Sequence, residues 1–249
     1  MNKNPLITYL KDLENDFKLF MNIEEFPTYE LQTKEVSETI AATQGFDVAA
    51  AAFYQPQSKS HTLLVSTNLV LSKYLVFHEF THILDSEMYA NSDKMRYVGL
   101  SGFTEYHASQ VELMQLLGAN TFDQTLSFSM NTIVSTFAGE KSVSEYVEGK
   151  QQHAIELFSR SDFPADINTL KSAIGVLYNY WGLRSICEMY STDYTEKINN
   201  EAFLKFIPTQ VFSIQNRLMH NHLDKGQIEL SMQAYRCTVM PLIQTYKLQ

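Results

Sequence analysis

Two histidines and a glutamate are spaced in this sequence in a way that predicts a metal-binding site. His78, Glu79 and His82 form the pattern H-E-x-x-H. Four residues make about one turn of an α-helix, so both imidazoles would project from one side and could ligate a single zinc ion. Glu79 is rotated away from that side, so we expect it to accept a proton from metal-held water instead of binding the metal.

The helix that must position these residues is predicted over residues 72–89. Apolar residues surround the motif, with Leu75 to Phe77 before it and Ile83 and Leu84 after it. A helix that is apolar on most sides is typically buried. Buried histidines and carboxylates are costly unless they are paired or bound to a metal, so this context favours a metal site over a coincidence.

A catalytic zinc needs a third protein ligand beside an open position. Glu105 is the predicted ligand, because it lies 23 residues after His82 at the start of the next expected helix, near residues 102–118. Glu112 shares the Glu105 face two turns later, so it is the second choice as ligand or a partner of a ligand. His107 points about 200° away from Glu105 around the helix and is the third choice.

Other polar residues could support the motif residues. Asp85 lies on the stripe of His78 and His82 and could accept a hydrogen bond from a ligand, although an aspartate near a helix end is often solvated. A donor for the developing oxyanion is also needed, and no spacing rule selects one. The candidates are Tyr97, Tyr106, His153, His220 and His222, and the last two indicate a polar surface more than a metal pair.

The predicted fold is α+β and predominantly helical, with a small hairpin packed on the H-E-x-x-H helix. A helix is expected over 4–21, a second one from Pro27 to Gly45, and a hairpin from strands at 47–54 and 61–67. Helices follow beyond Asn120, over 121–138, 142–160, 165–190, 195–205, 209–223 and 227–246. A core of residues 1–119 and an all-helical region of residues 120–249 are therefore expected, and they could pack as one domain.

Composition and charge restrict the partners and the cellular location of the protein. The chain has 249 residues and a net charge of −9. An acidic chain without a basic run argues against direct binding to nucleic acid. We expect no membrane span, because no apolar stretch reaches the roughly 20 residues needed to cross a bilayer. We expect no secretory signal, because residues 1–10 lack its charged start, long apolar middle and small-residue cleavage site. Cys187 and Cys237 lack the paired spacing of a disulfide framework or a zinc site, which favours a protein of the reducing cytoplasm. The sequence does not predict an oligomeric state.

The order of hairpin, H-E-x-x-H helix and glutamate helix resembles the zincin metallopeptidases of the gluzincin type. More narrowly, residues 45–118 look like the ImmA/IrrE-like metallopeptidases of bacteria and their mobile elements. Members of that family commonly show E-x-E-A-x-x-F-A-x-x-L after the zinc helix. Glu105, Ala108 and the leucines at the end of the stretch match this pattern, whereas His107, Val111 and Glu112 replace the second Glu, the Phe and the small residue.

The resemblance implies a zinc-dependent hydrolase that cleaves peptide bonds of a cytoplasmic protein, in some relatives a transcriptional repressor. His78, His82 and Glu105 would then hold zinc, and Glu79 would be the general base. The alternative is a non-catalytic zincin-fold module with a helical interaction surface. A third hypothesis is zinc-dependent hydrolysis of a non-peptide amide. Four aromatic residues beyond residue 120 are expected to pack in a core, namely Phe158, Tyr178, Tyr180 and Trp181.

Overall fold

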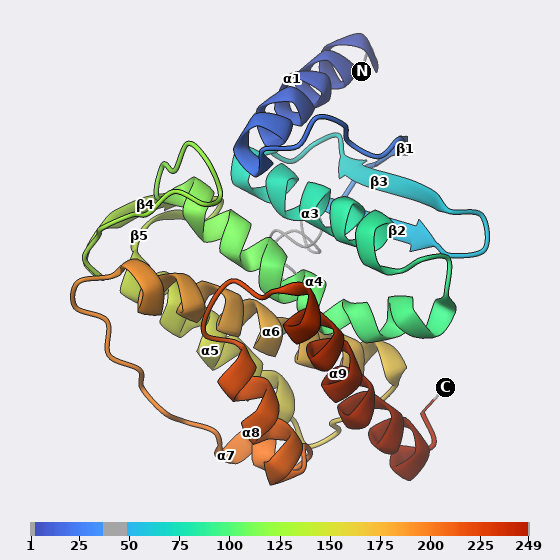
Figure 1. The fold of residues 1–249 in the computed structure, drawn as a ribbon, viewed down its shortest axis with the longest axis vertical. Helices are drawn as coiled ribbons and strands as arrows, with labels where there is room; N and C mark the ends of the chain where they lie inside the picture. Colours follow the sequence, from blue (N-terminus) through green and yellow to red (C-terminus); the bar gives the residue numbers. More distant parts are fainter. Residues whose placement is uncertain (1–2, 37–48, 249) are drawn as a thin grey trace. The chain divides into compact units, whose positions relative to one another are not determined.

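The computed structural model describes residues 3–36 and 49–248, and they form mostly helices with a small mixed sheet. The predicted α+β class with predominant helix is therefore confirmed (Figure 1). The chain divides into two compact units, which alternate along the sequence. Unit 1 contains residues 1–97, 111–125 and 134–140, and unit 2 contains residues 98–110, 126–133 and 141–249. The predicted division near residue 120 stays a prediction.

Unit 1 is built around helix α3, Lys73–Tyr89, which carries the motif. Helix α1, Lys3–Met21, precedes three strands, β1 (Tyr29–Lys34), β2 (Ala50–Gln55) and β3 (Ser60–Ser66). The sheet order is β1-β3-β2, with β1 parallel and β2 antiparallel to β3. Helix α3 packs beside β2 (Figure 1), as expected for a hairpin on the motif helix.

The hairpin prediction is confirmed, and the helix expected after Pro27 is wrong. Residues 29–34 instead form β1, whose backbone pairs with β3 from Tyr29 opposite His61 to Lys34 opposite Ser66. The spacing of Leu31 and Val36 resembled one helix face, but long-range strand pairing decides the structure of such short segments. Ile40 and Gly45, the other residues of that expected helix, lie outside the described residues.

Helix α4, Lys94–Leu116, begins eight residues before the predicted start at residue 102. Asp93 caps it, because its carboxylate accepts hydrogen bonds from the amides of Met95 and Arg96 at 2.7 and 3.0 Å. Gly102 was expected at the start of this helix, but it lies within it. In unit 2 a Cβ atom at Gly102 would lie 2.5 Å from Tyr235 and 2.6 Å from Tyr178, so this glycine permits a close approach.

The helix predicted over 121–138 is also wrong. This segment forms turns and strand β4, Ile133–Thr136, which pairs with β5, Gly139–Ser142. Backbone N–H and C=O groups of this segment form hydrogen bonds with distant residues, so these groups are not available for the hydrogen bonds of a helix. In unit 2, for example, the Met130 amide donates to Asp193 Oδ1 at 2.8 Å.

Helices dominate the remainder of unit 2. The long helices are α5 (Val143–Ser159), α6 (Ile167–Tyr190) and α9 (Lys225–Tyr246), close to their predicted bounds. Helix α8 (Thr209–Leu218) ends earlier than predicted, and α7 (Glu201–Leu204) is all the helix found within residues 195–205. The aromatic residues expected in the core are buried, namely Phe158, Tyr178, Tyr180 and Trp181.

Candidate metal centre

Helix α3 presents different residues to different neighbours. On one side, Phe77 and Phe80 pack edge-on against Phe17 of α1, with ring centroids 5.1 and 5.5 Å apart. All three rings are fully buried. This packing fixes the rotation of α3 about its axis, and the polar residues of the motif then project from the rest of its surface.

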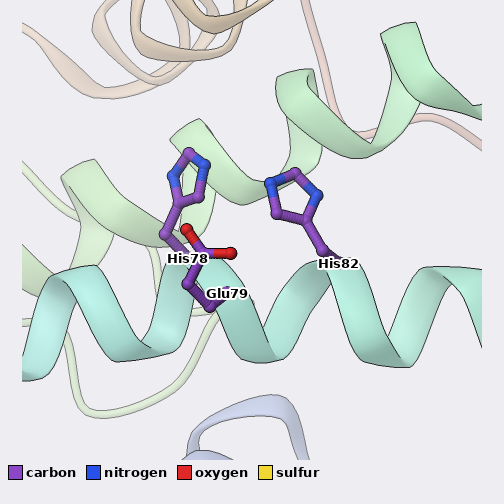
Figure 2. Close-up of side chains that lie close together, drawn as sticks. All are labelled: His78, Glu79 and His82. Atoms are coloured by element: carbon purple, nitrogen blue, oxygen red, sulfur yellow. The ribbon is translucent and has the colours of Figure 1, made fainter. Parts of the chain in front are cut away.

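His78 and His82 lie one helical turn apart on α3, as the motif predicted. Their rings meet edge to face, with centroids 4.9 Å apart and an interplanar angle of 76°. Figure 2 shows both imidazoles projecting from the same side of the helix, with the Glu79 carboxylate beside them. One ligand atom from each of these three residues lies within 4.8 Å of the others, which is close enough for a shared metal ion.

Glu112 of α4 holds the ring of His78. Nδ1 of His78 lies 2.8 Å from Oε2 of Glu112, and both side chains are buried. Because a carboxylate accepts, Nδ1 donates, which leaves Nε2 as the nitrogen suited to a metal. Metal-binding histidines commonly donate their second ring N–H to a carboxylate in this way. Such a partner role is one of the two roles that the position of Glu112 on the Glu105 face predicts.

Glu79 reaches the backbone of strand β2. The Ala52 amide donates a hydrogen bond to Glu79 Oε2 at 2.7 Å. Glu79 is buried, so this bond offsets part of the cost of removing a carboxylate from water and also fixes the direction of the carboxylate. No sequence pattern indicates this contact, because it depends on how the hairpin packs on α3.

Tyr74, one turn before His78, forms a further buried polar contact of this region. Its hydroxyl accepts a hydrogen bond from the Phe137 amide at 2.6 Å. Burial raises the pKa of Tyr74 to about 12, the Phe137 bond lowers it, and the nearby negative charge of Glu112 raises it. Tyr74 therefore stays neutral at physiological pH and acts as an acceptor that holds the 134–140 segment.

Glu105, the predicted third ligand, lies on α4 within unit 2. Its carboxylate carbon is 3.7 Å from the position of a Cβ atom at Gly175 of α6, and its charge is one of the factors that raise the pKa of Tyr235. Burial is the largest of those factors. Glu105 is not a member of the His78, Glu79 and His82 group, so its role as a ligand stays a prediction. His107, the third choice, stacks on Phe103 with centroids 5.5 Å apart.

Asp85 is fully buried and not solvated. It lies near Tyr89. Burial is the main cause that raises the pKa of the Tyr89 hydroxyl, and the charge of Asp85 raises it further. This burial agrees with a supporting role on the motif stripe, and the role itself stays a prediction.

The candidates for oxyanion stabilisation lie in different surroundings, and we assign none of them. Tyr97 belongs to unit 1, where its ring meets Tyr54 edge-on at 5.3 Å. In unit 2 the Tyr106 hydroxyl donates to the Asn221 carbonyl at 2.6 Å, and burial raises its pKa well above the usual value. The histidine candidates also belong to unit 2: His220 pairs with Glu188 at 2.6 Å, His222 Nε2 lies 3.4 Å from the Tyr190 hydroxyl, and His153 is exposed.

The donor set of unit 1 could hold a metal ion. Two imidazoles and a carboxylate gather on one helix, and one imidazole has its Nδ1 bonded to a carboxylate. Imidazole nitrogen and carboxylate oxygen are common zinc ligands, although manganese and cobalt occupy similar sets. Among residues 3–36 and 49–248 no other group of this kind is found.

The comparisons with known proteins add no family to this description. No family model, no curated protein and no solved structure matches the chain. Within the described part of the chain, none of the helices has both the length and the apolar character needed to cross a bilayer. The functional interpretation therefore depends on the residues and their geometry.

Proposed function

We propose that the chain is a zinc-dependent peptidase of the zincin type, in which His78 and His82 bind the metal and Glu79 is the general base. The observation that carries this proposal is the gathering of the three ligand atoms within 4.8 Å. The bond between His78 Nδ1 and Glu112 supports it, because a buried histidine oriented in this way is prepared to ligate through Nε2.

A bound zinc ion would supply Lewis-acid activation of water and of a carbonyl group. The chain's own contribution is to place and move a proton. Glu79 accepts the proton that the attacking water loses and delivers it to the leaving amine. The Ala52 amide holds Oε2 of Glu79, so the carboxylate keeps one orientation while the proton moves.

The position of strand β2 favours a peptide over another amide as the substrate. In the described sheet, β2 has β3 on one side as its sheet neighbour. The Ala52 amide bonds Glu79 and not β3, so Glu79 lies at the outer edge of β2. An extended peptide can add to such an edge through backbone hydrogen bonds.

The resemblance to ImmA/IrrE-like proteins extends this proposal to a protein substrate in the cytoplasm, such as a repressor. The net charge of −9 supports a basic partner. Association with such a partner should weaken as salt rises, because screening reduces the attraction between opposite charges. Association that is insensitive to salt would count against a basic partner.

Glu105 stays the proposed third ligand, and Glu112 is the alternative. Measuring the zinc content of Glu105→Ala and Glu112→Ala separates them. Loss of zinc in the Glu105 variant, with weaker but retained binding in the Glu112 variant, would support the proposal. Loss of zinc in the Glu112 variant alone would make Glu112 the ligand.

The Glu79→Gln variant tests the function. We expect it to retain zinc and to lose cleavage of a pooled peptide library, monitored by mass spectrometry, by roughly 10²- to 10⁴-fold, as expected for loss of a general base. The matched control is Glu25→Gln, which changes an exposed glutamate of unit 1 and should cleave like the wild type. Equal cleavage by Glu79→Gln and the wild type would reject the mechanism. Loss of zinc from Glu79→Gln would show that Glu79 is a ligand.

A further inference from the structure

A third histidine of unit 1, His61, is buried at the end of the hairpin. It is the second residue of β3 and pairs with Tyr54 of β2. The two rings stack with centroids 4.7 Å apart at 28°. Because Ala52, two residues before Tyr54, directs its amide to Glu79, the Tyr54 and His61 pair falls at a non-hydrogen-bonded position, where facing side chains are closest.

His61 also contacts helix α3. Its Nε2 lies 3.0 Å from Oε2 of Glu87 in the last turn of α3. The carboxylate accepts, so Nε2 carries the proton, whereas Nδ1 is buried without a hydrogen-bond partner. The His61 side chain is 2% exposed and that of Glu87 is 52% exposed, so the pair connects a buried strand position to the surface of α3.

The hairpin is therefore bonded to α3 at two points. One is the Ala52 amide on Glu79, and the other is His61 on Glu87. Glu79 and Glu87 are eight residues apart, or about 12 Å along the helix axis. Two separated bonds resist rotation and sliding of β2 along α3, which one bond cannot do.

We propose that His61 and Glu87 are positioning residues that hold strand β2 against α3 and so keep the Ala52 amide on the Glu79 carboxylate. We call Tyr54, His61 and Glu87 the hairpin clamp. The consequence for catalysis rests on the proposed function, whereas the structural link between the clamp and Ala52 does not depend on it.

Because Glu87 is half exposed, we expect the hairpin clamp to affect local opening of the hairpin more than the stability of the whole protein. A half-exposed pair adds little to global stability, since solvent screens it and its side chains lose conformational freedom. Its effect falls instead on local opening of the hairpin, which amide hydrogen exchange measures directly. The amide of Ala52 is the appropriate reporter, because it bonds the catalytic candidate itself.

The test compares Glu87→Ala and His61→Phe with the wild type, each as the full zinc-loaded chain. The phenylalanine keeps a ring for stacking on Tyr54 and removes the bond to Glu87. We expect the Ala52 amide to exchange about two- to fivefold faster in both variants, the range expected for loss of a half-exposed pair. Glu87→Gln retains an acceptor for Nε2 and should restore slow exchange.

The matched control is Asp16→Ala, which removes an exposed pair between α1 and the other end of α3, with Lys73 Nζ 2.7 Å from Asp16. It should leave Ala52 exchange unchanged. Unchanged exchange in Glu87→Ala would overturn the clamp, and because Glu87 is half exposed this variant should fold even if His61→Phe does not.

Catalysis gives the second measurement. With zinc content unchanged, Glu87→Ala should lower kcat for cleavage of the peptide library more than it changes KM, and Glu87→Gln should restore it. Faster Ala52 exchange with unchanged kcat would overturn the positioning role. Absence of cleavage by the wild type would count against the proposed function alone, because the exchange measurement still decides whether the clamp exists.

Discussion

Helices α3 of unit 1 and α6 of unit 2 are both largely buried and both carry buried polar side chains, but those side chains make different contacts. On α6, Nη1 and Nη2 of the fully buried Arg184 donate to four oxygens. The bonds reach Glu196 Oε1, Asn216 Oδ1, and the carbonyls of Asn216 and Met219, at 2.6 to 3.2 Å. On α3, the buried His78 and Glu79 bond Glu112 and Ala52, and together with the partly buried His82 they also place one ligand atom each within 4.8 Å of the others.

This difference separates structural from functional burial. A buried charge that is surrounded by acceptors of its own chain holds segments together, and Arg184 connects α6 to Asn216 and Met219 in this way. Metal-ligand atoms placed within 4.8 Å of one another are an arrangement that a bound cation would stabilise. Burial of polar residues alone therefore does not indicate a candidate site. The contacts of those residues must also place metal-ligand atoms close together.

The largest effect should follow from breaking the structural network of α6. Arg184→Met removes the four hydrogen bonds to oxygen and the 3.4 Å contact of Nη2 with His220 Nε2. It leaves these acceptors without their donor, so we expect the free energy of unfolding to fall by about 3 kcal/mol or more. Urea denaturation of the zinc-free protein measures it. Arg160→Met, at the exposed pair with Asp162, is the control and should change stability little. Near-wild-type stability of Arg184→Met would show that the hydrogen bonds of Arg184 do not hold the segments of unit 2 together.

A smaller effect should appear at the bond that orients His78. Glu112→Ala removes the acceptor of His78 Nδ1, and we expect zinc affinity to fall about 10- to 100-fold, as for other partners of metal-binding histidines. Competition with a chromophoric chelator measures this affinity. Glu188→Ala removes the carboxylate partner of His220 in unit 2 and should leave zinc affinity unchanged. Equal affinities in the Glu112 variant and the wild type would show that the His78 bond does not serve metal binding.

The smallest effect is expected at Tyr74. Tyr74→Phe leaves the Phe137 amide without its acceptor, which should cost about 1 kcal/mol of stability. The raised pKa of about 12 also predicts a pH dependence, because the folded state favours the neutral hydroxyl. This contribution is complete below about pH 10 and is lost as pH rises toward 12.

Urea denaturation between pH 9 and pH 12 tests the sign of this dependence, and the loss of stability should be shallower in Tyr74→Phe. Tyr246→Phe changes a tyrosine that is 44% exposed, and its stability should fall with pH as the wild type does. The same steep fall in Tyr74→Phe would contradict a raised pKa at Tyr74.

Local spacing was sufficient to predict the elements that carry the motif. The apolar run around His78 predicted α3, and the polar segment between two apolar runs predicted the hairpin. The structure shows both histidines on one side of α3, as the four-residue spacing requires (Figure 2). These features depend on residues that are near each other in the sequence.

Contacts between distant segments were beyond the sequence pattern. Strand β1 exists because it pairs with β3, and Gly102 lies inside α4 because Tyr178 and Tyr235 approach it closely. The Ala52 bond to Glu79 and the His61 bond to Glu87 likewise need the packed hairpin. Glu112 was foreseen as a possible partner of a ligand, because its position on one helix face could be worked out from spacing.

Metal stoichiometry decides whether α3 carries a metal site. Zinc content after equilibrium dialysis should be one ion per chain in the wild type and close to none in His82→Ala. His153→Ala changes an exposed histidine of unit 2 and should bind like the wild type. A wild-type chain that binds no zinc, or a His82→Ala variant that binds one ion as tightly as the wild type, would contradict the account.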